Sequence, residues 1–64
     1  MFGWNFLNAS GEEIGHSPRF PDAIAAEEWI GSSWRDLRER GVDEVELYDH
    51  ARDDRVYRMG LDGE

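Results

Sequence analysis

Alternation of apolar and polar residues predicts a strand pair at the start of the chain. Phe2, Trp4 and Phe6 recur at every second position, which is the period of a half-buried strand over residues 2–7. Residues 8–11 form a turn-rich segment in which a glycine can adopt a positive φ. Residues 12–17 then indicate the returning strand, with Ile14 directed to the core and Gly15 marking a bulge or a close backbone approach.

A second strand pair is predicted at the other end of the chain. Residues 43–49 alternate again and place Val45 and Leu47 on one face. Residues 50–54 are rich in turn-forming types, and residues 55–61 follow as the last strand. The remaining residues, 62–64, are expected to be a frayed end.

Between the two pairs the spacing predicts a helix over residues 23–40. Asp22 is a good N-cap, and Gly41 stands where a left-handed C-cap belongs. At 100° per residue, one stripe of this helix faces the sheet, flanked on opposite sides by Trp29 and Trp34. The residues of the stripe are Ala23, Ala26, Ile30, Ser33 and Leu37.

The order of elements predicts one α+β domain over residues 1–64. Two strands, one helix and two strands form a ββαββ chain, in which both hairpins join one four-stranded antiparallel sheet and the helix packs on one face. The order of the strands stays open at this level. The expected core is Phe2, Trp4, Phe6, Ile14, Ile30, Trp34, Leu37, Val45, Leu47, Tyr57, Met59 and Leu61.

The second face of such a sheet has no helix to cover it. The residues expected there are Asn5, Leu7, Tyr48, Val56 and Arg58. Three of them are apolar or aromatic, and if they cluster they mark a contact site rather than scattered surface hydrophobes. Packing of sheet on sheet in a homodimer is one use of that face, because small domains often gain stability by association.

Charge narrows the range of partners. The 64 residues contain 15 acids and seven basic residues, all of them Arg, for a net charge of −8. Such a surface repels phosphate and anionic lipid, so we expect no direct binding to nucleic acid or membrane. The excess acid either serves solubility or is an acidic face for a basic partner. The second possibility includes an inhibitor or a nucleic-acid mimic of viral origin.

The sequence offers little catalytic chemistry. It contains no Cys and no Lys, and neither a nucleophile elbow nor a phosphate-binding glycine loop is recognisable. The one tight group of His and carboxylates is Asp49, His50, Asp53 and Asp54, a weak candidate for a metal site. A hairpin turn explains the same residues, because Asp commonly hydrogen-bonds its own backbone there. Whether His16 meets His50 as a pair depends on the strand order. We therefore expect no cofactor and no enzymatic activity.

The chain carries no apolar run long enough to span a membrane and no signal-peptide pattern, so a cytoplasmic protein is expected. It resembles small uncharacterised acidic proteins of high-GC bacteria. That resemblance covers nearly all of the chain and implies a ββαββ fold without any known activity. The segments that carry it are Trp4-x-Phe6-x-x-x-x-Gly11, Phe20-Pro21-Asp22, Ala26-Glu27-x-Trp29-Ile30, Trp34-Arg35-x-Leu37 and Val56-Tyr57-Arg58-Met59.

A weaker similarity links residues 34–38 to MbtH-like adaptor proteins, which support adenylation enzymes, but their Ser-Leu-Trp-Pro motif is missing. The function expected from all these features is a non-catalytic protein–protein interaction module, a small accessory or regulatory chain of a larger protein. The alternative is an acidic inhibitor or nucleic-acid mimic. The residues expected to contact a partner are Leu7, Tyr48, Val56, Arg58, Trp29 and Arg35.

Overall fold

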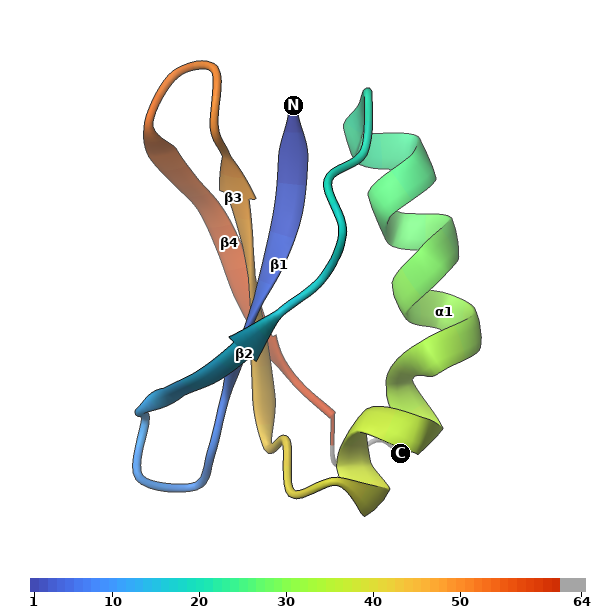
Figure 1. Ribbon diagram of the computed structural model, residues 1–64, viewed down its shortest axis with the longest axis vertical. Helices are drawn as coiled ribbons and strands as arrows, with labels where there is room; N and C mark the ends of the chain where they lie inside the picture. Colours follow the sequence, from blue (N-terminus) through green and yellow to red (C-terminus); the bar gives the residue numbers. More distant parts are fainter. Residues whose placement is uncertain (62–64) are drawn as a thin grey trace.

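The computed structural model describes residues 1–61 and shows an α+β fold in ββαββ order (Figure 1). Its elements are β1 (Phe2–Leu7), β2 (Glu13–His16), α1 (Ala23–Glu39), β3 (Glu44–Asp49) and β4 (Asp54–Gly60). The four strands form one antiparallel sheet in the order β2-β1-β3-β4, and α1 lies along one face of it. The expectation for residues 62–64 lies outside the described residues.

The first hairpin turns where the sequence predicts and contains a bulge. Gly11 has a φ of 83°, which a glycine adopts without strain. On β2 the pairing shifts from Phe6 opposite Gly15 to Leu7 opposite Glu13, so that Ile14 is the extra residue. The prediction that Ile14 belongs to the core is therefore wrong, because the bulge leaves it 49% exposed.

Both ends of α1 are capped as the sequence predicts. The Asp22 carboxylate accepts a hydrogen bond from the backbone N–H of Ala25 at 2.8 Å, which satisfies one of the free donors of the first turn. After the helix Gly41 adopts a φ of 95°. The N–H groups of Gly41 and Val42 donate to the carbonyls of Arg38 and Leu37, the paired bonds of a Schellman motif.

The core lies between α1 and the two central strands. Trp4, Val45 and Leu47 are fully buried, and Trp4 donates its indole N–H to the carbonyl of Ala26 at 2.8 Å. Besides the exclusion of Ile14, the larger cluster differs from the predicted core because it includes the buried Ala26 and Val42. The prediction that Tyr57 belongs to the core is wrong, since this residue is 37% exposed and lies outside this cluster. The buried members are Trp4, Ala26, Ile30, Leu37, Val42, Val45, Leu47 and Leu61, and the half-buried Phe2, Phe6, Trp34 and Met59 pack against them.

The two flanking tryptophans of α1 reach different parts of the sheet. Trp29 stacks on Phe6 with ring centroids 6.1 Å apart and lies 5.7 Å from the ring of Phe20. Trp34 lies on the other side, with Met59 and Leu61 of the β4 end. The prediction that they flank the stripe on opposite sides is confirmed. No helix in residues 1–61 has both the length and the apolar character needed to cross a bilayer.

Candidate functional site

The sheet face turned away from α1 is a charged surface. Glu44, Glu46 and Tyr48 alternate with the buried residues of β3 and therefore point to that face. Arg55 of β4 lies 2.9 Å from the carboxylate of Glu46, and Arg58 lies 3.5 Å from that of Glu44. Both arginine side chains are at least half exposed, so these ion pairs contribute little stability, but they give this face alternating charge.

A second bulge decides which residue of β4 faces Tyr48. Leu47 pairs with Tyr57, but Tyr48 pairs with Arg55, so Val56 is the extra residue. Val56 is 47% exposed and does not stand opposite Tyr48. The hydroxyl of Tyr48 donates to the carboxylate of Asp53, and this bond together with nearby negative charge raises the pKa of Tyr48. Tyr48 and Val56 are therefore not opposite each other across β3 and β4.

Leu7 is not available as a contact residue. It alternates with Phe6 and so belongs to the face away from α1, yet only 6% of it is exposed. The expectation that Leu7 is an exposed contact on the open face is therefore wrong. Arg58, by contrast, keeps half of its side chain exposed, as that expectation requires.

The two helix residues among the predicted contacts have different surroundings. Trp29 is half-buried between Phe6 and Phe20, so most of its ring serves the core. Arg35 is exposed and holds its guanidinium 5.3 Å from the centre of the Trp34 ring. Of the two predicted contact residues on α1, Arg35 is therefore the one that faces solvent.

Between α1 and β4 lies an apolar groove that the sequence pattern did not single out. Its volume is about 220 Å³, and its lining is almost wholly apolar. The groove residues are Ile30, Gly31, Trp34, Met59, Gly60 and Leu61. The groove runs beside the edge strand β4, whose outer side has no neighbouring strand among the described residues. The run of small residues after Ile30 is the feature of the sequence that could have predicted the groove, because small side chains leave space on the helix surface.

The residues considered for a metal site form a hairpin turn instead. The carboxylate of Asp49 accepts hydrogen bonds from the backbone N–H groups of Ala51 and Arg52, at 3.0 and 3.3 Å. Asp53 adopts a φ of 54° and accepts from Tyr48. Asp54 pairs with Asp49 across the start of β4. Within residues 1–61 no three His, Cys, Asp or Glu side chains gather as metal ligands would.

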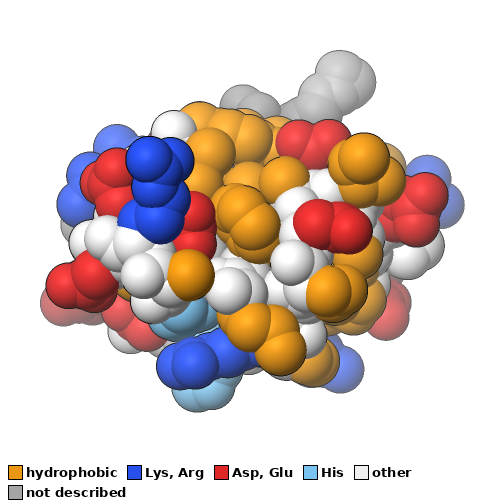
Figure 2. Space-filling view, turned by 90° about the horizontal axis from the view of Figure 1, so that it is seen from above, with side chains coloured by type: hydrophobic (Ala, Val, Ile, Leu, Met, Phe, Trp, Pro, Cys, Tyr) orange, Lys and Arg blue, Asp and Glu red, His pale blue; other side chains and the backbone are white. Residues whose placement is uncertain are grey.

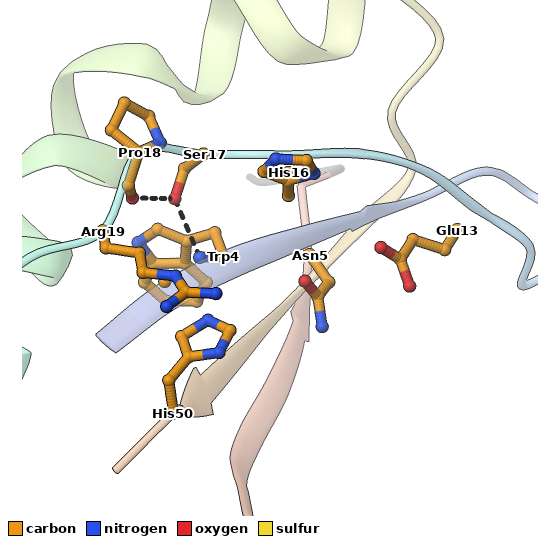
Figure 3. A pocket seen from close by; sticks show the side chains of 9 residues that line it. Trp4, Asn5, Glu13, His16, Ser17, Pro18, Arg19 and His50 are labelled. Atoms are coloured by element: carbon orange, nitrogen blue, oxygen red, sulfur yellow. Dashed lines mark hydrogen bonds between the residues drawn. The ribbon is translucent and has the colours of Figure 1, made fainter. Parts of the chain in front are cut away.

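His50 points away from that turn and into a cavity with His16. The strand order, left open by the sequence, places β1 between β2 and β3, so the end of β2 and the end of β3 meet over Gly3. A cavity of about 380 Å³ forms there. Figure 3 shows Arg19 beside His50, with Asn5, Glu13 and His16 along the same cavity. The sequence predicts Asn5 on the open sheet face but not as part of a site, and it does not point to Arg19.

Comparison of the chain with known protein families, with curated proteins and with solved structures gives no match. The resemblance to small acidic proteins of high-GC bacteria therefore stays a prediction.

Proposed function

We propose that this protein is a non-catalytic interaction module, a small cytoplasmic accessory or regulatory chain. It would bind an extended segment of another protein along the edge of β4. The observation that carries the proposal is the apolar groove beside β4, whose outer edge pairs with no strand in residues 1–61. An added strand gains backbone hydrogen bonds from such an edge, and its alternate side chains enter the neighbouring groove.

Of the two sheet edges, β4 is the better acceptor. β4 has seven residues, whereas β2 has four and is followed closely by Pro18, which cannot donate to a ladder. Exposed apolar side chains are also present on β4, because Val56 and Tyr57 are 47% and 37% exposed. Natural proteins usually protect such an edge unless it has a use.

Charge favours a particular kind of segment. The chain has a net charge of −8, so a partner segment with apolar residues for the groove and basic residues around them is complementary to it. The groove supplies contact area and the charge supplies steering, which makes binding only partly dependent on salt.

A variant that fills the groove tests the proposal. A Cβ built at Gly31 meets nothing within 4 Å, so Gly31→Arg is compatible with the fold while it places a long cationic side chain over the groove. Ser32→Arg is the matched control, because Ser32 is exposed and is not a groove residue. Immobilised protein is exposed to native lysate, and retained proteins are identified by mass spectrometry.

We expect one partner that stays bound in 0.5 M NaCl, where the screening length is roughly 4 Å. Gly31→Arg should abolish retention of this partner, and Ser32→Arg should leave it unchanged. A partner retained equally by both variants would show that binding does not use the groove. A partner that elutes with moderate salt favours the acidic inhibitor or mimic instead. Retention of nothing but further copies of the chain would replace the proposal by a homodimer.

A further inference from the structure

The cavity over Gly3 lies on the sheet face opposite to α1 and is separate from the groove at β4. Gly3 and Asn5 alternate with the buried Trp4, so both face away from the helix. The cavity of about 380 Å³ is bordered by β1, by the segment that follows β2 and by His50 at the end of β3. Figure 3 shows the Arg19 guanidinium directly beside the His50 imidazole, whereas Glu13 lies at the far end.

The segment that carries Arg19 is anchored on both sides. The hydroxyl of Ser17 accepts a hydrogen bond from the N–H of Trp4 at 2.8 Å and donates one to the carbonyl of Pro18 at 2.7 Å. After Arg19, Phe20 and Phe2 exchange two backbone hydrogen bonds of 2.6 and 2.8 Å. Because residues on both sides are fixed to β1, the backbone of Arg19 is held in place before any ligand arrives.

His50 is held in the same way from the other wall. Its backbone N–H donates to the carbonyl of Met1 at 2.7 Å, and its ring lies 5.0 Å from the ring of Tyr48. A Cβ built at Gly3 would lie 3.2 Å from Nε2 of His50, which is tighter than most real contacts. The absence of a side chain at Gly3 therefore provides the space in which this ring lies.

The charges around His50 are unusual for so acidic a chain. Arg19 and the amino terminus face it with positive charge, and Asp49 and Asp53 face it with negative charge. Burial and the positive charge of Arg19 together lower the pKa of His50. Within residues 1–61 no carboxylate lies at ion-pair distance from Arg19. Arg19 and the amino terminus thus bring positive charge to this wall of the cavity in a protein of net charge −8, although Asp49 and Asp53 offset part of it at His50.

We propose that this cavity binds a small organic molecule through one oxyanion group, a carboxylate or a phosphate, held by Arg19 and His50. Arg is suited to this because its guanidinium donates two parallel hydrogen bonds to such a group. Glu13 at the far end disfavours a second negative group there and favours hydrogen-bond donors on the rest of the ligand, which Asn5 can also contact. The cavity of about 380 Å³ leaves space beyond the oxyanion for the rest of the ligand.

The test is titration of ¹⁵N-labelled protein with sodium phosphate and, separately, sodium acetate, followed by amide NMR at constant ionic strength. We expect saturable shifts at Gly3, Ser17 and His50, and a rise in the pKa of His50 in the bound state, because the anion favours the imidazolium. The anion that binds more tightly identifies the group. Sodium chloride at equal ionic strength is expected to give no saturable shift.

Three variants locate the binding. Arg19→Gln is expected to weaken it by about tenfold or more, the effect of losing a charged hydrogen bond. Arg52→Gln removes the same charge from an exposed turn outside the cavity and should change binding by about twofold at most. Gly3→Ala should weaken binding by displacing His50, with the amide spectrum otherwise retained.

Absence of saturation with both anions, or equal effects of Arg19→Gln and Arg52→Gln, would overturn the proposal. Both outcomes are independent of the groove at β4, because no groove residue lines this cavity.

Discussion

The bulge in β4 decides whether Arg55 or its neighbour Val56 stands opposite Tyr48. Without a bulge, Val56 would stand opposite Tyr48 and extend an apolar patch on the open face. With the bulge, Arg55 takes that position and pairs with Glu46 at 2.9 Å. A single additional residue therefore places a charged side chain instead of an apolar one opposite Tyr48, because strand alternation has a period of two.

At the same scale, His50 makes stability depend on pH. Its pKa in the folded protein is lowered by burial and by Arg19, so the unfolded chain binds a proton more readily. Well above the ordinary histidine pKa of about 6.5, His50 is neutral in both the folded and the unfolded chain and does not reduce the free energy of unfolding. As the pH falls through and below that value, the unfolded chain takes up a proton first, so the free energy of unfolding decreases. Urea unfolding at pH 7.5 and at pH 5.5 should show this loss, and His50→Asn should lose less over the same interval. An NMR titration that gives His50 an ordinary or raised pKa would contradict it.

Among the elements, α1 shows most clearly how local rules position a larger structure. Asp22 and Gly41 fix its two ends, and the Schellman bonds bring Val42 back onto Leu37, where both are buried. The chain therefore leaves α1 in a fixed direction before β3 begins. The glycine inside α1 serves no such purpose, because Gly31 has an ordinary backbone and open space around it.

These two glycines predict opposite effects of the same substitution. Gly41→Ala should destabilise the protein by about 1 kcal/mol, because alanine is strained at a φ of 95°. Gly31→Ala should stabilise it by about 0.5–1 kcal/mol through helix propensity. Urea midpoints at an unchanged m value measure both effects. A gain in stability with Gly41→Ala would show that the cap does not require its left-handed conformation.

For the whole molecule, the decisive contact joins the helix to the centre of the sheet. Trp4 comes from the central strand β1, is fully buried and donates its indole N–H to the carbonyl of Ala26 on α1. Its ring system also packs edge-to-face with the ring of Tyr57 of β4, with ring centroids 5.9 Å apart at an angle of 72°. Figure 2 shows hydrophobic side chains reaching the surface at one end of the molecule, with charged side chains around them. The interior of so small a domain is only a few side chains deep, so one aromatic residue spans it.

Trp4→Phe is therefore expected to cost about 2–4 kcal/mol of unfolding free energy, from the lost hydrogen bond and the space left by the smaller ring. Trp34→Phe is the control, since its ring is half-buried and is packed at the rim of the groove. Its cost should be about 1 kcal/mol or less. Thermal or urea unfolding followed by circular dichroism compares the two variants. Equal losses would mean that the indole N–H of Trp4 contributes nothing particular.

The amino-acid sequence alone determined the elements, because each depends on local rules. Alternation of Phe2, Trp4 and Phe6 set β1, and Asp22 and Gly41 set the ends of α1 to within one residue. The ββαββ order and the sheet with one helix followed from these elements and are confirmed. The partner-binding role, the lack of catalysis and the cellular location stay predictions.

Tertiary structure decided what depends on pairing between distant strands. The two bulges exposed Ile14 and moved Val56 out of line with Tyr48, and neither shift is visible in a pattern read one strand at a time. The strand order brought Arg19 and His50, 31 positions apart in the sequence, to one cavity. Side chains from different segments become neighbours only through the register of the sheet. The elements of this protein could therefore be predicted from local sequence, whereas its sites could not, because they depend on how the strands pair.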